Sequence, residues 1–449
     1  MPTTTTAIHP DQVHKILNKH LLTDGFEMVL DLEKSQGPYL YDSKSGKQYL
    51  DFFTFFASNP LGMNHPKIAG DFDFVSKLGR TAINKPSNSD VYTNELAEFM
   101  SSFSRVAVPE HLPHSFFISG GALAVENAMK VAFDWKVQKN FQKGYRHELG
   151  HKVLHFEKAF HGRSGYTLSV TNTVEDKVKY FPKFDWPRVI SPANMFPETV
   201  DGLASVAKQE ELAILQAERY FELYKDDIAC ILIEPIQGEG GDRHFRLEFH
   251  KALRELAYKH EALLIYDEVQ TGVGMTGKFW AHEHFVTPDI ISFGKKAQVC
   301  GILAGPRVDE VETNCFAVSS RINSTWGGNL VDMVRFGRIL NIIEEDNLVQ
   351  NAAYVGEHLV SRLVHLTEKH EYLSNPRGKG LFCAIDLPDS HSRNAVVNEC
   401  IANGLMILSC GDNTVRFRPP LTITTEQIDE GLDILEKAYI KSLDKCPVA

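Results

Sequence analysis

Short apolar runs alternate with amphipathic stretches along the middle of the chain. Four of these runs have the length and composition of buried strands: Lys152–Phe156, Ile228–Glu234, Ala262–Asp267 and Ile290–Phe293. Before the third run, Phe249, Leu253 and Leu256 recur at helical spacing, which predicts a helix with one buried face. Strands that alternate with helices are typical of a mostly parallel sheet covered by helices. We therefore predict an α/β fold.

The N-terminal part of the chain shows shorter elements. Residues 11–35 are expected to form a helix and an approach segment. Tyr39–Asp51 holds two strand-like runs around a polar turn with Gly46, which predicts a β-hairpin. The aromatic run Phe52–Phe56 that follows suits either the core or the apolar wall of a pocket.

The C-terminal part predicts a second, smaller unit. Asn329 to about Glu345 is expected to form one long helix that leaves the sheet. Gly380–Ile385 is then expected to be a strand of the smaller unit, and Thr424 with Gln427 fits a capping box at the start of a final helix.

Composition and charge narrow the classes of function. The chain of 449 residues is 43% hydrophobic and 23% charged, which is ordinary for a soluble protein. Its formal net charge of −11 argues against nucleic acid as the main partner. No apolar run is long enough to span a membrane, and Met1–Thr6 has no features of a signal peptide, so a cytoplasmic location is expected. The seven cysteines are scattered, and we expect reduced, mostly buried thiols.

Two carboxylates follow the third apolar run, in Asp267-Glu268-Val-Gln270-Thr-Gly272. Catalytic groups of open α/β folds lie just beyond the carboxyl ends of strands. A carboxylate in such a buried position is costly unless something positive meets it. Asp267 is therefore the favoured functional acid, and a helix cap or turn acid is the alternative.

Two further segments carry chemistry. Ser115–Ile118 predicts a strand that leads through Ser119-Gly-Gly-Ala122 into a helix, and such a helix start favours a phosphate group. The strand Ile290–Phe293 is followed by glycine and Lys295, and a lysine at this edge can form a Schiff base with a carbonyl cofactor. Pyridoxal phosphate needs such a lysine, an acid for its pyridine nitrogen and a phosphate site.

Three other patterns are weaker. His147-Glu-Leu-Gly-His151 matches the zinc motif HExxH, but Gly150 lies inside it and a strand is predicted from about Lys152, so no metal site is expected. Gly272–Lys278 resembles a phosphate-binding P-loop, yet Phe279 replaces the hydroxyl residue that holds Mg²⁺, which leaves an NTPase as the alternative from another class. No G-x-G-x-x-G follows a strand, so a nucleotide-dependent dehydrogenase is unsupported.

Taken together, the Asp267–Gly272 segment and Pro288-Asp-Ile-Ile-Ser-Phe-Gly-Lys295 resemble the signature of class III, fold-type-I aminotransferases. Further matching segments are Ser119–Ala122, Phe160-His-Gly-Arg163, Glu234-Pro-Ile-Gln-Gly-Glu239-Gly, Ser324-Thr-Trp-Gly-Gly-Asn329 and Arg416-Phe-Arg-Pro-Pro420. The resemblance implies a large domain with a mostly parallel seven-stranded sheet and a smaller α+β domain built from both chain ends. The expected boundaries are residues 1–70 for the segment that joins the small domain, 71–328 for the large cofactor-binding domain and 329–449 for the small domain.

The resemblance also implies roles for individual residues. Lys295 and Asp267 are the expected catalytic residues. The expected contacts to pyridoxal 5'-phosphate are Gly121, Ala122, Phe160, Asp267, Gln270, Lys295 and Thr325, the last from the other subunit of a homodimer. The expected substrate contacts are Phe56, Arg163, Glu239, Gln270, Asn323 and Arg416. Glu239 is expected to pair with Arg416 when an amine substrate is bound and to swing away for a dicarboxylate substrate.

Within the class, the segments Asn84–Asp90, Glu239–Phe245 and Asn323–Leu330 are most similar to those of bacterial lysine 6-aminotransferases. This implies transfer of the ε-amino group of L-lysine to 2-oxoglutarate, with ornithine or 4-aminobutyrate left open as the amine donor. One departure affects the catalytic lysine, because Lys295 and Lys296 stand where most members have one lysine. The strand register favours Lys295, and counting back from Gly301 favours Lys296.

Overall fold

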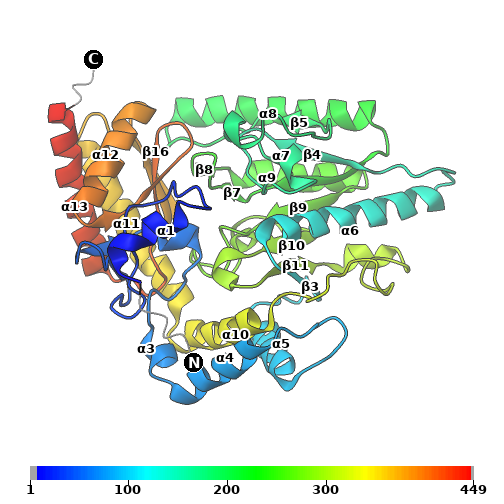
Figure 1. The fold of residues 1–449 in the computed structure, drawn as a ribbon. Coiled ribbons are helices and arrows are strands. Elements are labelled where there is room, and N and C mark those ends of the chain that lie inside the picture. Colours follow the sequence, from blue (N-terminus) through cyan, green and yellow to red (C-terminus); the bar gives the residue numbers. More distant parts are fainter. Residues whose placement is uncertain (1–7, 446–449) are drawn as a thin grey trace.

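A sheet of seven strands forms the centre of the computed structural model, which describes residues 8–445 (Figure 1). In spatial order its strands are β3 (His114–Ile118), β11 (Cys300–Ala304), β10 (Ile290–Phe293), β9 (Leu263–Asp267), β6 (Ile228–Ile233), β4 (Lys152–Phe156) and β5 (Arg188–Val189). The five strands from β10 to β5 run parallel, and β11 is antiparallel to both of its neighbours. The predicted mostly parallel seven-stranded sheet is confirmed.

Helices cover both faces of this sheet because successive strand residues point to opposite sides. On β9, Leu263 and Ile265 pack in a core with the long helix α6 (Gly121–Gln142). Leu264 and Tyr266 pack instead in the larger core on the other face. Helices that enter this larger core include α5 (Asn94–Val106), α8 (Val200–Leu223), α9 (Leu247–Lys259) and α10 (Leu330–Glu345).

A second, antiparallel sheet lies beside the first and belongs to the C-terminal part of the chain. Its strands are β12 (Ser374–Lys379), β13 (Phe382–Asp386), β16 (Thr414–Phe417) and β15 (Leu408–Cys410). Its helices are α11 (Leu348–Lys369), α12 (Ser390–Ala402) and α13 (Thr425–Lys445). As predicted, a capping box begins α13, since the backbone N–H of Thr424 donates to Gln427 and that of Gln427 donates to the Thr424 hydroxyl.

The two ends of the chain meet in a third, small sheet. The predicted hairpin is present as β1 (Tyr39–Tyr41) and β2 (Gln48–Asp51). β2 also pairs in parallel with β14 (Leu405–Met406), so the N-terminal hairpin is joined to the C-terminal part. This pairing supports the division into two domains that the sequence suggests, and we keep the boundaries at residues 70 and 328 as a proposal.

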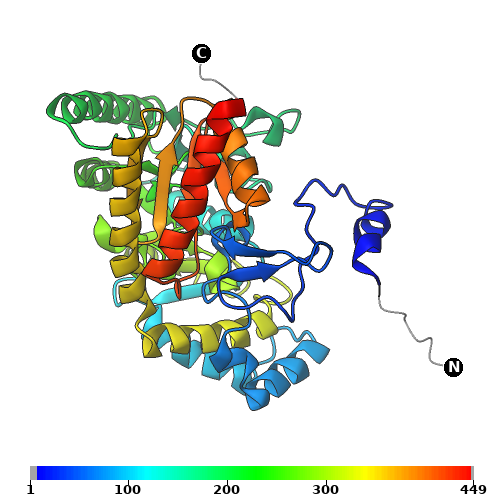
Figure 2. The ribbon, with the colours of Figure 1, turned by 90° about the vertical axis from the view of Figure 1, so that its left-hand side faces the viewer.

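Short elements connect these layers. They are α2 (Thr54–Ala57), α3 (Pro66–Ala69), α4 (Phe72–Ile83), α7 (Thr167–Val170), β7 (Ile236–Gln237) and β8 (Arg243–His244). The helix expected within residues 11–35 is reduced to the short turn Pro10–Gln12 and α1 (Val13–Leu17), neither of which buries a residue. α1 stands apart from the rest of the fold (Figure 2). A helix without a buried face has no packing energy to extend it, which explains the shorter element.

The weaker sequence patterns do not form the structures that their motifs require. His147–His151 lies in a loop rather than on a helix. Gly272–Lys278 is a series of turns, and the element that follows it is the short 3-10 helix Ala281–His284 rather than an α-helix. Among residues 8–445 all six cysteines are free thiols, five of them buried, while Cys446 and the start Met1–Thr6 lie outside the described residues. In the same range, no helix has the length and apolar character needed to cross a membrane.

The packing of α11 on the second sheet predicts a pair of opposite stability effects. A Cβ atom added at Gly356 would lie 2.1 Å from the backbone of Gly380, in the turn between β12 and β13. We expect Gly356→Ala to lower the free energy of unfolding by about 1–3 kcal/mol through overpacking. The control is Gly79 in α4, where the added atom meets nothing within 4 Å, so Gly79→Ala should raise it by about 0.5–1 kcal/mol. Denaturant unfolding of both variants measures the difference, and equal effects would contradict the packing.

Candidate active site

The carboxyl ends of the parallel strands bring the predicted residues to one edge of the central sheet. Ser292 of β10 lies directly beside Asp267 of β9 in the register of the two strands. Lys295 follows two residues after the end of β10. A cavity of about 280 Å³ opens at this edge. It is lined by Gly121, Ala122, Phe160, His161, Gly162, Glu234, Ile236, Glu239, Asp267, Val269, Gln270, Thr271 and Lys295.

The two adjacent lysines have different surroundings. Lys295 lines the cavity, and none of the described residues forms a hydrogen bond or ion pair with its Nζ. Burial, with a smaller contribution from Arg416, lowers the pKa of Lys295 to about 8. Lys296 is 2% exposed, and its Nζ donates to the carbonyl oxygens of Ala57 at 3.2 Å and Gln270 at 2.9 Å. Only Lys295 therefore presents a free amine to the cavity.

The carboxylate of Asp267 is held by donors from three directions. Its Oδ2 accepts a hydrogen bond from His161 Nδ1 at 2.8 Å. Its Oδ1 accepts from the Ser292 hydroxyl at 3.1 Å and from the backbone N–H of Val269 at 3.0 Å. Because a carboxylate can only accept, the proton between His161 and Asp267 belongs to the imidazole Nδ1 in the ionised pair. These donors fix the orientation of the acid inside the fold.

The side-chain amide of Gln270 is oriented by a buried ion pair. Arg418 lies 2.5 Å from Asp242, and both side chains are almost fully buried. Nε and Nη2 of Arg418 also donate to Gln270 Oε1 at 3.2 and 3.0 Å. A guanidinium has no acceptor, so it must face the amide oxygen. The NH₂ group of Gln270 is therefore the part left to serve as a donor at the cavity.

The N-terminus of α6 also lines the cavity. Gly120 precedes this helix with a φ of +108°, a conformation that favours glycine, and Gly121 and Ala122 form its first residues. A Cβ atom at Gly162 would lie 2.4 Å from the Ala122 side chain, so glycine is required for the loop to approach the helix. The first N–H groups of a helix have no partner within it and, together with the helix dipole, attract a phosphate.

Glu234 and Phe160 also line the cavity. Glu234 accepts hydrogen bonds from the backbone N–H groups of Phe160 and Gly238, both at 3.0 Å. Burial raises the pKa of Glu234 to about 7, although His161 opposes this shift. The ring of Phe160 supplies an apolar surface. A free lysine amine, an oriented carboxylate, an amide donor and a helix N-terminus around one cavity match the chemical groups of pyridoxal phosphate.

Glu239 lies between two cations at the rim of the cavity. Its Oε2 lies 3.0 Å from Nη1 of Arg416, and its Oε1 lies 2.6 Å from Nζ of Lys177. Burial pushes the pKa of Glu239 upward, but Arg416 and Lys177 outweigh it and leave the pKa lowered. Nε of Arg416 is buried and has no hydrogen-bond partner among the described residues. The guanidinium of Arg416 is thus held by Glu239 through Nη1.

Phe56 lies beside this ion pair on an unusual turn. The ring is 53% exposed and its centre lies 5.9 Å from Cζ of Arg416. All four residues of α2, Thr54–Ala57, have φ between +41° and +63°. Such a left-handed turn costs about 1–2 kcal/mol per residue. Hydrogen bonds from the N–H groups of Phe53 and Thr54 to Asp51, and from Lys296 to Ala57, hold it in place.

Five predicted residues are not among those that line the cavity: Arg416, which pairs with Glu239, Phe56 beside it, and Arg163, Asn323 and Thr325. Arg163 follows Gly162 but is exposed. Asn323 and Thr325 are exposed on the segment before α10, which is attached to residues 85–89 by hydrogen bonds and by Lys85 over the Trp326 ring. The fold of one chain therefore leaves Arg163, Asn323 and Thr325 exposed, outside the lining of the cavity.

The sequence reasoning also missed residues that the structure places in the site. His161 and Arg418 stand inside segments that were recognised, but their partners became visible only in three dimensions. Ser292, a polar residue within an apolar strand, was a signal that could have been used. Lys177 gave no signal, since it is one of many lysines in a polar segment.

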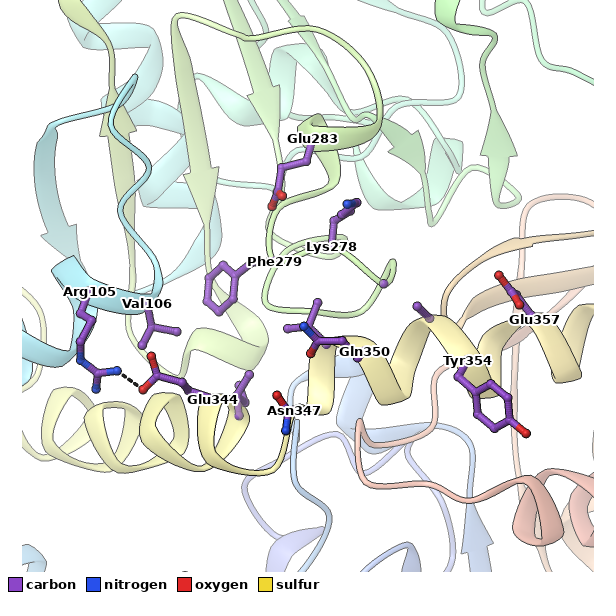
Figure 3. A pocket seen from close by; sticks show the side chains of 14 residues that line it. Arg105, Val106, Lys278, Phe279, Glu283, Glu344, Asn347, Gln350, Tyr354 and Glu357 are labelled. Carbon is purple, nitrogen blue, oxygen red and sulfur yellow. Dashed lines mark hydrogen bonds and ion pairs between the residues drawn. The ribbon is translucent and has the colours of Figure 1, made fainter.

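A larger cavity of about 690 Å³ lies elsewhere, between the turn after Gly277 and helices α10 and α11 (Figure 3). Lys278, from the segment that resembles a P-loop, lines it, as does an ion pair of Arg105 with Glu344. Figure 3 shows Tyr354 and Glu357 on the adjacent helix. None of the predicted cofactor or substrate residues lines this cavity.

Comparisons with known proteins give a consistent picture. An L-lysine-epsilon aminotransferase of Mycobacterium tuberculosis is 52% identical over 431 residues, which cover 96% of this chain and 95% of the relative. The solved structure of lysine aminotransferase from M. tuberculosis in the internal aldimine form superposes with a TM-score of 0.95 at 50% identity, covering 97% of this chain and 100% of that one. A human mitochondrial 4-aminobutyrate aminotransferase is 31% identical over 443 residues, covering 91% of this chain and 84% of that protein.

The family model described as aminotransferase class-III matches residues 23–439, which is most of the chain. Class III aminotransferases use pyridoxal phosphate as their cofactor. The side chains and helix N-terminus that line the cavity match the chemical groups of this cofactor. The chain belongs to the class III aminotransferases.

Proposed function

We propose that this aminotransferase moves the ε-amino group of L-lysine to 2-oxoglutarate, giving 2-aminoadipate 6-semialdehyde and L-glutamate. The observation that carries the proposal is the ion pair of Glu239 with Arg416 at the rim of the cavity. It leaves the site without a free carboxylate receptor beside the reacting amine. The 52% identity to a relative named for lysine supports the same donor, against 31% for one named for 4-aminobutyrate.

Pyridoxal phosphate, when bound, supplies the carbonyl that receives the amine and a ring that takes up the electrons released at the substrate carbon. In our proposal Gly121 and Ala122 hold its phosphate through backbone N–H groups, and Phe160 faces its ring. Asp267 supports the proton on the pyridine nitrogen, and the NH₂ group of Gln270 donates to the ring oxygen. Thr325 of a second subunit adds a hydroxyl at the phosphate.

We assign the proton transfers to Lys295. Its Nζ would take a proton from the ε-carbon of lysine and return it to the cofactor's reacting carbon. A pKa of about 8 suits this work, because the amine is then neutral in a useful fraction of molecules near neutral pH. Lys296 cannot take over this role without giving up its two hydrogen bonds to backbone carbonyls.

The same site must accept two unlike substrates in turn. L-Lysine brings an amine with its α-carboxylate far away, and Arg163 is proposed to bind that distant carboxylate, with Asn323 and Phe56 bordering the chain. 2-Oxoglutarate has a carboxylate beside its carbonyl group, for which Arg416 is the proposed receptor. Glu239 would then have to leave Arg416, since both carboxylates cannot occupy the same guanidinium face.

Amine-donor profiling with 2-oxoglutarate tests the proposed function. We expect kcat/KM for L-lysine to exceed that for L-ornithine by about 10-fold to 200-fold, the range for one methylene group in a shaped site. 4-Aminobutyrate should be a poorer donor still. Lys295→Ala should abolish turnover with every donor, which serves as the control for contaminating activity. A clear preference for ornithine or 4-aminobutyrate would replace lysine as the substrate.

The pKa of Lys295 predicts a pH dependence that can be measured on the cofactor-free protein. An amine reacts with acylating reagents only when it is neutral, so labelling of Lys295 should rise with a midpoint near pH 8. A lysine side chain with the ordinary pKa of about 10.4 would instead show a midpoint more than two pH units higher. Peptide mapping after brief acetylation at a series of pH values gives the curve. A Lys295 midpoint near 10 would argue against this environment.

We further propose a homodimer with shared sites. Leu22 is 87% exposed and Trp326 is 45% exposed, and both belong to surfaces that the chain does not cover itself. The segment with α1 projects from the fold (Figure 2), and the Trp326 segment carries Thr325 and Asn323, which one chain leaves outside its own cavity. A second copy that covers these surfaces would complete the site. Apolar patches of this kind are typical of protein interfaces.

Sedimentation at assay concentration tests the dimer. The protein should sediment as a dimer, and Leu22→Asp should shift it toward the monomer because a charge would enter the apolar contact. Leu223→Asp is the matched control, since Leu223 is 65% exposed at the end of α8. A fully active monomer of the unaltered chain would rule the shared site out.

A further inference from the structure

Lys177 is a second cation on Glu239 that neither the sequence motifs nor the family signature marked. It belongs to the single turn Glu175–Lys177, which lies between α7 and β5. Its Nζ contacts Oε1 of Glu239, whereas Arg416 contacts Oε2. The two cations therefore hold different oxygens of one carboxylate.

The position of Lys177 is determined by contacts on both sides of its turn. Upstream, Asn172 is tied to the β4 region, because its backbone N–H donates to Ala159 and its side chain to Phe156, both at 2.9 Å. Downstream, Nζ of Lys183 donates to the carbonyl oxygens of Val178 and Phe181. Nζ of Lys177 also lies 5.4 Å from the centre of the Phe160 ring. The ammonium is thus kept near the cavity.

The exposed fractions of the Arg416, Glu239 and Lys177 side chains show why Glu239 needs a second cation when it leaves Arg416. Arg416 is 4% exposed, Glu239 23% and Lys177 31%. A carboxylate that leaves Arg416 without reaching water or another cation would be an unpaired charge in a largely buried site, which is costly. Lys177 is the cation that already touches Glu239 when Arg416 is given up, and it is the more exposed of the two.

We propose that Lys177 is a specificity-determining residue that retains Glu239 when a substrate carboxylate takes its place on Arg416. This inference rests on the proposed function, because Lys177 would be the partner of Glu239 after the substrate carboxylate displaces it from Arg416. While Glu239 pairs with Arg416, Lys177 shares the carboxylate with that arginine. Once a dicarboxylate neutralises Arg416, Lys177 is the cation left for Glu239, so its contribution is largest in that state.

The inference predicts opposite effects of two substitutions. Lys177→Met leaves Glu239 with Arg416 alone, so Arg416 should be harder to release. The half-reaction with 2-oxoglutarate should fall about tenfold through a higher KM, and the half-reaction with L-lysine should stay within about twofold. Glu239→Gln, which weakens the pair itself, should impair the lysine half-reaction and spare the other one.

The test is single-turnover kinetics of each half-reaction, together with calorimetric binding of glutarate to the cofactor-loaded enzyme. Glutarate has both carboxylates and no reacting carbonyl, so it reports access to Arg416 apart from chemistry. Lys177→Met should weaken glutarate binding about tenfold, and Lys177→Arg should restore it. Lys179→Met is the matched control, because Lys179 lies next to the same turn and pairs with Asp176 rather than with Glu239.

Each outcome separates the inference from the proposed function. Equal losses in both half-reactions of Lys177→Met, or unchanged glutarate binding, would overturn the role of Lys177. If Glu239→Gln impairs the lysine half-reaction selectively while Lys177→Met has no effect, the exchange on Arg416 stands and only the role of Lys177 falls. If Glu239→Gln lowers both half-reactions equally, the exchange itself fails, and the inference fails with it.

Discussion

The site depends on a buried carboxylate that the fold must keep paired. Asp267 is 5% exposed at the end of a strand with no water-facing side, and an unpaired charge there would oppose folding. His161, Ser292 and the backbone of Val269 supply the donors, and they come from three different segments. The loop after β4, the neighbouring strand and the turn after β9 are thereby held in register around one acid. The cavity is a consequence of that arrangement.

The same principle extends outward as a series of paired charges. Asp242 and Arg418 are both almost fully buried, and their pair orients the amide of Gln270. At the rim, Glu239 is shared by Arg416 and Lys177, and exposure increases from the inner cation to the outer one. The Asp242–Arg418 pair thus lies deepest, and the pair of Glu239 with Lys177 lies nearer to solvent. In the proposed function, the carboxylate that would change partners is therefore the more exposed one.

Much of this could be predicted from the sequence because buried parallel strands leave a strong signal. The apolar runs ending at Asp267 and Phe293 located the ends of two strands, and parallel pairing brings these ends to one edge of the sheet, so that Asp267 and Lys295 line one cavity. The partners His161 and Lys177 could not be found in this way, because contacts between loops depend on packing rather than on periodicity. The choice between two adjacent lysines had the same difficulty. Lys296 is excluded because its ammonium donates to the backbone carbonyl oxygens of Ala57 and Gln270. Both of these residues are distant from Lys296 in the sequence.

In the left-handed turn Thr54–Ala57, the backbone of Phe56 is tightly constrained and its side chain is not. The turn is held by main-chain contacts to Asp51 and Lys296 and by the Thr54 hydroxyl on the Arg418 carbonyl, whereas the Phe56 ring is more than half exposed. The backbone at Phe56 is therefore specified by buried neighbours that also serve the cofactor site. In the proposed function Phe56 borders the amine substrate. A substitution at this position would then change the wall of the site while the strained backbone and the buried residues that hold it stay in place.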